Sequence, residues 1–373
     1  MLIGALRDKI RPQPASAFKQ RASDGAEPKE SFVPREEEEA EGFFTGIRDL
    51  AQKAVEGLRR PKLPLYKEAA GGYEVAIERF SFKDEERGRK IPLTVYHPQN
   101  LKSGEKSPVV VFSHGLAGNE LTYRYFGKHL ASHGYTVLQP THLGSDTTSF
   151  IRRPSLKIFS QKELVDRTRD VSYVLDLVDN KVLPERITAQ ADMENVALAG
   201  HSFGALTAQA MAGVDVVDKN GAEAAVEDER IDAFIGMSPY GDSLPTHLLG
   251  MDPKSYAEIE KPLLTLSGDH DRIFTGTEGP NVHLDTFYGA SSEHKYHVVI
   301  DKTMHASFGQ VFGLIGITAA VANSTSTAFL DSTLKQDKAA HKYLQSDLPE
   351  VALSHDCHAF VGPHCGTSHS PQT

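Results

Sequence analysis

The segment Gly200-His201-Ser202-Phe203-Gly204 places a serine between two glycines at a spacing that suits nucleophilic catalysis. The apolar run 196–199 before it predicts a buried strand, and the stretch 203–212 after it predicts a helix. A sharp turn between strand and helix holds such a serine in a strained backbone conformation with its hydroxyl exposed. Because glycine has no Cβ, strand and helix can approach closely on both sides of it. This context predicts that Ser202 attacks an ester-like carbonyl carbon.

A serine hydroxyl needs a base to become a nucleophile, and His305 is the histidine best placed to supply one. The run 296–300 predicts a strand, and His305 follows on the loop just beyond its end. The last strand of the sheet would deliver a base to the serine at that point. His283, His294 and His297 come before or within this strand, so we expect them to be structural or exposed.

The acid that orients the histidine is expected between the serine and the histidine in chain order. The run 263–268 predicts a strand, and Asp269 and Asp271 follow it. Open α/β sheets place their functional residues at such carboxyl ends. We predict Asp271 as the acid, because the catalytic aspartate usually lies three residues after the glycine that ends this strand. Asp269 is the alternative acid or a turn-capping residue. Asp242, after the strand predicted at 233–237, is a third option.

The negatively charged oxygen of an acyl-transfer intermediate needs two backbone N–H donors. Phe203, the residue after the serine, would supply one of them. The run 108–113 predicts a buried strand that ends in His114-Gly115, and a loop after an early strand is where the second donor is needed. We therefore predict the N–H of Leu116 as the second donor of an oxyanion hole.

The surrounding elements alternate in a way that would bring these residues together. Two strands are predicted first, at 73–80 and 91–98. Continuous apolar runs follow, which predict strands covered on both faces. These runs lie at 108–113, 136–140, 196–199, 233–237 and 262–267, and helical stretches lie between them at 121–133, 163–178 and 203–212. Alternation of this kind predicts an α/β fold with a mostly parallel central sheet and helices on both faces.

Three blocks of the sequence together resemble the type II platelet-activating factor acetylhydrolase family, whose bacterial relatives are labelled predicted dienelactone hydrolases. The blocks are 112–118, 130–135 and 200–205, and the resemblance covers roughly residues 73–345. It implies an α/β-hydrolase fold and a metal-independent serine esterase, with the nucleophile on Ser202 and the base on His305.

The chain departs from that family in two ways. Acetylhydrolases carry the acid after the strand that follows the nucleophile helix, and Ser238 stands where that aspartate would be expected. The acid is therefore predicted to have moved to Asp271, as in polyester hydrolases and cutinase-like enzymes. True dienelactone hydrolases use a cysteine nucleophile, and no cysteine lies near Ser202, so that label does not indicate a substrate.

Both ends of the chain differ in composition from the middle. Residues 1–60 are polar and rich in proline, which predicts a poorly ordered extension with an amphipathic helix near 43–58. The catalytic domain is expected at 73–345. The tail 346–373 holds both cysteines, Cys357 and Cys365, among four histidines; we favour a tail without a bound metal or a disulfide over a small metal site or one short-loop disulfide.

Charge and hydropathy narrow the classes of function. The net charge is −10 and the calculated pI about 5.9, which argues against nucleic acid as a partner. No apolar run is long enough to span a bilayer, and the N-terminus does not resemble a signal peptide, so a cytoplasmic protein is expected. We expect neither a cofactor nor a metal ion.

These observations predict a serine hydrolase that cleaves carboxylic esters, of the short-chain acyl or phospholipid-acetyl type, through a Ser-His-Asp mechanism. Two alternatives remain open. One is a membrane-associated lipid or polyester hydrolase that uses the helix near 43–58 to reach a membrane surface. The other is a binding protein that has the α/β-hydrolase fold and no catalytic activity.

Overall fold

A computed structural model of the chain describes residues 65–152, 158–218, 220–272, 280–309 and 316–345. All of them belong to the unit Ala51–Thr373, one of two into which the chain divides. The predictions for the extension 1–60, for its helix near 43–58 and for the tail 346–373 lie outside the described residues.

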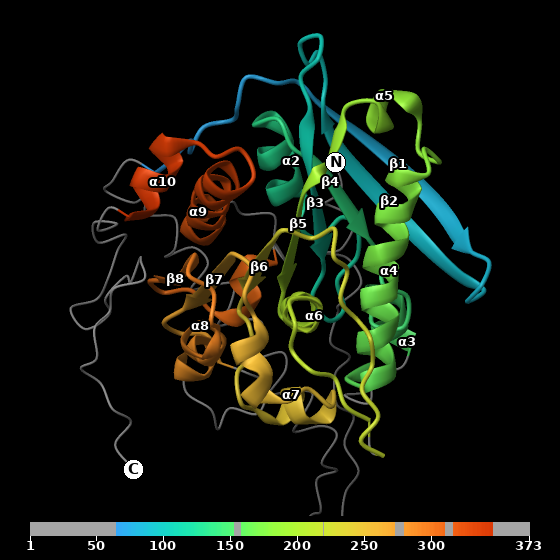
Figure 1. Cartoon of the computed structure of the whole chain (residues 1–373), viewed down its shortest axis with the longest axis vertical. Helices are drawn as coiled ribbons and strands as arrows, with labels where there is room; N and C mark the ends of the chain where they lie inside the picture. Colours follow the sequence, from blue (N-terminus) through green and yellow to red (C-terminus); the bar gives the residue numbers. More distant parts are fainter. Residues whose placement is uncertain (1–64, 153–157, 219, 273–279, 310–315, 346–373) are drawn as a thin grey trace, which may run out of the picture. The chain divides into compact units, whose positions relative to one another are not determined.

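The described strands form a single sheet in the order β1-β2-β4-β3-β5-β6-β7-β8 (Figure 1). β1, β2 and β4 pair antiparallel, and all pairs from β4 through β8 are parallel. The strands are β1 Val75–Asp84, β2 Arg89–Pro98, β3 Ser107–Ser113, β4 Thr136–Pro140, β5 Ala191–His201, β6 Ala233–Met237, β7 Leu263–Gly268 and β8 Lys295–Ile300.

Helices connect the parallel strands and cover both faces of the sheet. They are α2 Arg124–Ser132, α3 Thr147–Arg152, α4 Gln161–Asp179, α5 Glu185–Thr188, α6 Phe203–Met211, α7 Leu244–Leu248, α8 Asp285–Gly289, α9 Ile317–Thr333 and α10 Lys338–Gln345, with short 3₁₀ helices η2 Pro253–Glu258, η3 Pro280–Leu284 and η4 His305–Phe308. The predicted α/β-hydrolase class, a mostly parallel sheet with helices, is confirmed.

The apolar strands form two cores because their side chains alternate between the faces of the sheet. In β3, Val109 and Val111 pack into the core that contains residues of α4 and α6, whereas Val110 and Phe112 pack into the core that contains residues of α2 and α9. Figure 1 shows α4 and α9 on opposite sides of the strands. A strand buried on both faces needs apolar residues at every position, which explains the continuous runs in the sequence.

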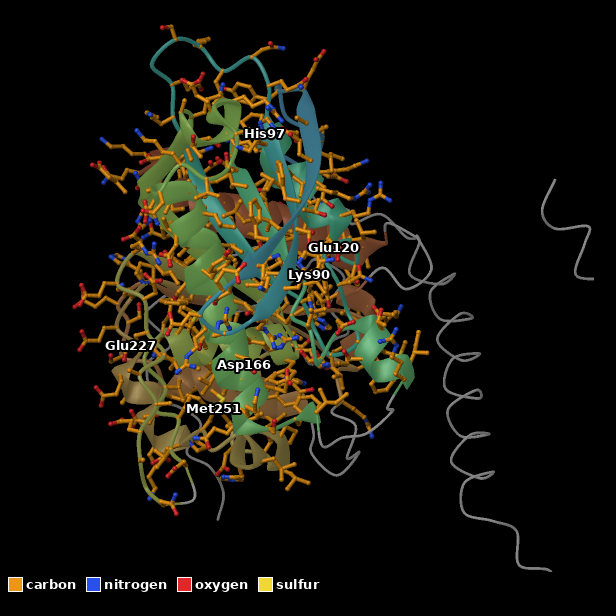
Figure 2. All side chains as sticks on the ribbon, turned by 90° about the vertical axis from the view of Figure 1, so that its right-hand side faces the viewer. Lys90, His97, Glu120, Asp166, Glu227 and Met251 are labelled. Atoms are coloured by element: carbon orange, nitrogen blue, oxygen red, sulfur yellow. The ribbon has the colours of Figure 1, made fainter. Side chains whose placement is uncertain are left out.

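The antiparallel hairpin of β1 and β2 is longer than the sequence suggested. β1 continues to Asp84, and β2 begins at Arg89 after a short turn in which Gly88 adopts a φ of +60°. The charged side chains of this region either face solvent, as Lys83 does, or are half-buried in ion pairs, as Asp84 is with Arg87, so their charge does not prevent strand formation. Lys90 and His97 mark the two ends of β2 in Figure 2.

The parallel strands determine where loops meet. Ser113 at the end of β3 lies in register with Gly200, His201 with Met237 at the end of β6, and Gly268 at the end of β7 with Ile300. The segments that follow β3, β5, β6, β7 and β8 therefore emerge side by side at one edge of the sheet.

None of the helices in the described ranges combines the length and the apolar character that a membrane crossing requires.

Candidate active site

Ser202 occupies a tight turn between β5 and α6. Its φ of 54° lies in the left-handed region that a non-glycine residue rarely adopts, and its N–H donates to the carbonyl of Met237, 3.0 Å away. A Cβ on Gly200 would overlap the carbonyl of Gly204, and one on Gly204 would overlap the carbonyl of Ser113. The flanking glycines are therefore required by close contact of the strand and the helix.

The serine itself is more enclosed than the motif suggests. Ser202 is 3% exposed, and the hydroxyl of Tyr240, from the segment after β6, lies 3.4 Å from its Oγ. The same Tyr240 hydroxyl lies 3.4 Å from Nε2 of His305. Tyr240 thus contacts both groups and was not expected from the sequence, which offered no pattern around it.

His305 begins η4, in the loop after β8, and connects the serine to an aspartate. Its Nε2 lies 2.8 Å from Ser202 Oγ, and its Nδ1 lies 2.8 Å from Oδ1 of Asp271. With the proton on Nδ1, the ring donates to the carboxylate and presents the Nε2 lone pair to the hydroxyl. The arrangement allows proton transfer from serine to histidine while the carboxylate holds the ring.

Asp271 is fully buried and accepts a further hydrogen bond. Its Oδ2 accepts from the hydroxyl of Ser238, 2.5 Å away, at the position where acetylhydrolases were expected to carry the acid. Burial raises the pKa of Asp271, but the attraction of His305 and the contact with His283 outweigh it and hold that pKa well below its usual range. The carboxylate is therefore ionised at neutral pH.

The other two aspartates considered as the acid lie elsewhere. Asp269 pairs with Nδ1 of His270 at 2.8 Å, and its Oδ1 accepts from the N–H of Thr303 at 3.3 Å. This aspartate ties the loop after β7 to the loop after β8. Asp242 is exposed and pairs with Nε2 of His247 at 2.7 Å. Of the three, only Asp271 contacts the ring of His305.

The two predicted oxyanion donors lie on neighbouring segments. Phe203 is the first residue of α6, so its N–H has no partner within the helix. Leu116 lies in a turn after β3, next to Ala117, whose φ of +60° reverses the chain. Within the described ranges, neither N–H donates to an acceptor. Both are therefore available to a ligand.

A family model described as Chlorophyllase matches residues 67–310. The chain belongs to this family. It is 26% identical to chlorophyllase type 0 of Chenopodium album over 265 residues, which cover 68% of each chain. The resemblance to platelet-activating factor acetylhydrolases, stated above from three sequence blocks, is confirmed at low identity.

Two acetylhydrolases illustrate that similarity. The chain is 24% identical to the enzyme of Cavia porcellus over 297 residues, which cover 67% of this chain and 62% of the relative. It is 24% identical to the enzyme of Canis lupus familiaris over 285 residues, which cover 63% and 59%. The chain thus spans about three fifths of the length of these acetylhydrolases. Membership of this family places the protein among the carboxylic ester hydrolases.

A series of hydrogen bonds that the sequence did not suggest links three loops around Ser202. His201 Nε2 lies 2.9 Å from the carbonyl of His305 and donates to it. Burial lowers the pKa of His201 to about 3, so the ring carries a single proton, and its Nδ1 accepts from the hydroxyl of Tyr123, 2.6 Å away. That hydroxyl accepts from the N–H of Gly115, 3.3 Å away. These hydrogen bonds connect the loop after β3, which carries Leu116, with the loop that carries His305.

A buried arginine also supports the loop after β3. Arg167, on α4, is fully buried and donates to the His114 carbonyl at 2.8 Å, to Ser145 Oγ at 3.0 Å and to Ser113 Oγ at 3.2 Å. Its guanidinium lies 4.2 Å from the ring centroid of Phe203. Burial lowers the pKa of Arg167 to about 9, which still leaves it charged at neutral pH. It makes no ion pair with the residues that the structure describes.

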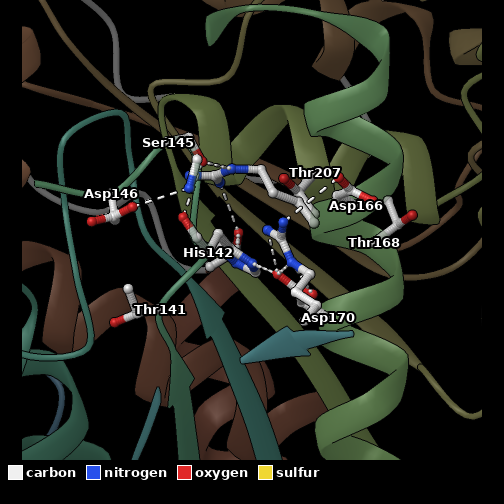
Figure 3. A network of polar contacts seen from close by, with 12 residues as sticks. Thr141, His142, Ser145, Asp146, Asp166, Thr168, Asp170 and Thr207 are labelled. Atoms are coloured by element: carbon white, nitrogen blue, oxygen red, sulfur yellow. Dashed lines mark hydrogen bonds and ion pairs between the residues drawn. The ribbon is translucent and has the colours of Figure 1, made fainter. Parts of the chain in front are cut away.

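The arginine belongs to a larger polar network, drawn in Figure 3 around Ser145, His142 and Asp170. His142 lies 3.0 Å from Ser113 through Nε2 and 3.0 Å from Asp170 through Nδ1. Asp170 in turn pairs with Arg89 of β2 at 2.9 Å. The sequence predicted a helix at 163–178 and gave no sign that its buried face is polar.

His283, expected to be structural or exposed, is buried against Asp271. Its Nε2 lies 3.2 Å from Asp271 Oδ1. Ligand-type atoms of Asp271, His283 and His305 lie within 4.8 Å of one another, close enough for a metal ion. His305 uses both ring nitrogens in hydrogen bonds to Asp271 and Ser202, whereas Nε2 of His283 has, among the described residues, only the ion-pair contact with Asp271. The expectation that no metal takes part stays a prediction.

Proposed function

We propose that this protein hydrolyses carboxylic esters through a covalent acyl-enzyme on Ser202. His305 is the general base, Asp271 is the acid of the triad, and the N–H groups of Leu116 and Phe203 form the oxyanion hole. The observation that carries the proposal is the unbroken contact from Ser202 Oγ through His305 to Asp271, with both steps at 2.8 Å. Membership of a hydrolase family supports it independently.

In the first half-reaction, Ser202 Oγ attacks the ester carbonyl while its proton passes to Nε2 of His305. The tetrahedral oxyanion accepts hydrogen bonds from the two backbone N–H groups. Asp271 stabilises the positive imidazolium and keeps its ring in place. The C–O bond to the alcohol then breaks, and His305 returns the proton to the departing oxygen.

In the second half-reaction, water replaces the alcohol. His305 takes a proton from water as the water oxygen attacks the acyl carbon. Collapse of the second tetrahedral intermediate breaks the bond to Ser202 Oγ, which recovers the proton from His305, and a carboxylic acid leaves. No cofactor is needed for either step.

We propose short-chain acyl esters, including acetylated phospholipids, as the substrate class. The name platelet-activating factor acetylhydrolase of two relatives supports this choice, and the name chlorophyllase of another adds chlorophyll as a compound to test. Hydrolysis should be measured on p-nitrophenyl esters from acetate to decanoate, on an acetylated phospholipid and on chlorophyll. Rates that increase steadily toward decanoate would contradict the short-chain choice.

Labelling with a fluorophosphonate tests the nucleophile itself. The unmodified chain and Ser291→Ala, which removes an exposed serine hydroxyl, should both be labelled and active. Ser202→Ala should lose labelling and ester turnover and keep its circular dichroism spectrum. Labelling that persists in Ser202→Ala would refute the assignment. Absence of labelling and of turnover in the unmodified chain would favour a binding protein without catalytic activity.

A further inference from the structure

His283 is a second histidine on the carboxylate of Asp271, and it is completely buried. It lies in η3, and its Nδ1 is 2.6 Å from the carbonyl oxygen of Pro239. Its Nε2 is 3.2 Å from Asp271 Oδ1. Its ring is roughly parallel to that of His305, with the two centroids 6.3 Å apart. Asp271 is thus held between two imidazole rings, only one of which the proposed mechanism uses.

Both ring nitrogens of His283 face acceptors. A carbonyl oxygen can only accept, so Nδ1 must carry a proton to contact Pro239. An ionised carboxylate can also only accept, so a bare Nε2 would set its lone pair against Asp271 Oδ1. Both contacts are attractive only when the ring carries two protons and a positive charge.

The electrostatic surroundings agree with this protonation. Burial lowers the pKa of His283, but hydrogen bonding and attraction to Asp271, together with the carbonyls of Pro239 and Asp271, raise it above the usual value. Among the described residues, the titratable groups that face His283 are Asp271, Asp285, Tyr240, His201, His297 and His305. The first two are carboxylates, and burial lowers the pKa of His201 and of His297 to about 3, which leaves both neutral.

We propose that His283 is a positioning residue that remains a buried imidazolium at neutral pH, fixes the carboxylate of Asp271 and opposes protonation of His305 in the free enzyme. This role rests on the proposed function of the triad. The positive ring makes a second positive charge on His305 less favourable. Removal of this positive charge is therefore expected to change the pH dependence of the reaction.

The first test is the pH profile of kcat/KM, whose acid limb reports protonation of the free enzyme's base. Two unit charges 6.3 Å apart, at an effective dielectric constant of about 20, shift a titration by up to about two pH units. His283→Gln should move the acid limb to higher pH by about one to two units. His297→Gln is the matched control, because His297 is equally buried and contacts Thr265 and Ser267 instead of Asp271. Its acid limb should not move.

The second test needs neither turnover nor a variant. Long-range ¹⁵N–¹H spectra of the unmodified chain at pH 7 to 8, assigned by ring-to-backbone correlations, should show protons on both nitrogens of His283. One protonated nitrogen would overturn the proposal, as would an acid limb that is unchanged in a folded His283→Gln. If the unmodified chain hydrolyses no ester, the proposed function fails, while the spectra still decide the charge of His283.

Discussion

Replacing Arg167 by methionine should damage both stability and catalysis, because this side chain supports the loop after β3 that carries Leu116, a proposed oxyanion donor. The substitution keeps a long apolar stem but removes the donors for the His114 carbonyl, Ser145 Oγ and Ser113 Oγ. It also removes the cation above the ring of Phe203, whose own N–H is one of the proposed oxyanion donors.

The expected loss of stability follows from these contacts. Hydrogen bonds to a charged group stabilise by about 1.5–3 kcal/mol each, and burying the guanidinium costs several kcal/mol, so the net contribution is smaller than the sum. In the variant, three buried acceptors lose their donor, which destabilises the folded state. We therefore expect Arg167→Met to lower the free energy of unfolding by about 2–4 kcal/mol. Arg167→Lys keeps the charge but not the planar fork, so its loss should be intermediate.

The expected loss of activity follows from the position of the loop. Removing one oxyanion donor outright lowers kcat by about 100- to 1000-fold. Arg167→Met should displace the Leu116 N–H without deleting it, so we expect kcat to fall about 10- to 100-fold. KM should change little, because the hydrogen bond to the oxyanion strengthens mainly in the transition state.

Urea unfolding and steady-state hydrolysis of a p-nitrophenyl ester measure the two effects. Arg169→Met is the matched control, because Arg169 lies on the same helix and is exposed. It should leave both quantities unchanged. A folded Arg167→Met that keeps kcat within twofold would refute the supporting role in catalysis, and an unchanged free energy of unfolding would refute the network as a source of stability.

Three further predictions use the same assays. Asp271→Asn should lower kcat/KM by about three to four orders of magnitude while Asp269→Asn lowers it less than tenfold, and a loss confined to Asp269→Asn would reverse the choice of acid. Gly204→Ala should give little folded protein, because its methyl group overlaps the last carbonyl of β3; normal expression with full activity would contradict the tight elbow. Burial lowers the pKa of His201 and of His297 to about 3. Between about pH 6.5 and 3 these two histidines therefore bind more protons in the unfolded chain than in the folded one, so their contribution to the free energy of unfolding falls as pH falls. His201→Gln should reduce that slope by about 1.4 kcal/mol per pH unit in urea unfolding, and an unchanged slope would contradict a neutral buried ring.

Contiguous residues were enough to predict the elements and the elbow. The strand before Ser202, the helix after it and the two glycines are neighbours in the chain, so their spacing alone indicates the turn. The continuous apolar runs likewise predicted buried parallel strands, because a strand covered on both faces admits few polar residues. His305 followed from the same reasoning, as the first histidine beyond the last strand.

Which of two aspartates separated by one residue contacts His305 could be seen only in the tertiary structure. Asp269 and Asp271 follow the same strand, and the sequence could only rank them by their reach. Asp269 is bound to the loop after β8 through Thr303, and the chain then turns, with the Asp271 N–H donating to the Gly268 carbonyl at 3.1 Å. That turn delivers the second carboxylate to His305.

The supporting residues could not be predicted from the sequence at all. Arg167 meets Ser113 across 54 positions of the chain, and Tyr123 meets His201 across 78. Burying a charge or a hydroxyl is favourable only when partners from other elements satisfy it. Sequence periodicity records which positions are apolar and carries no trace of such partners. The proposed nucleophile and base therefore follow from local sequence patterns, whereas the groups proposed to hold them in place, His283 among them, depend on the tertiary structure.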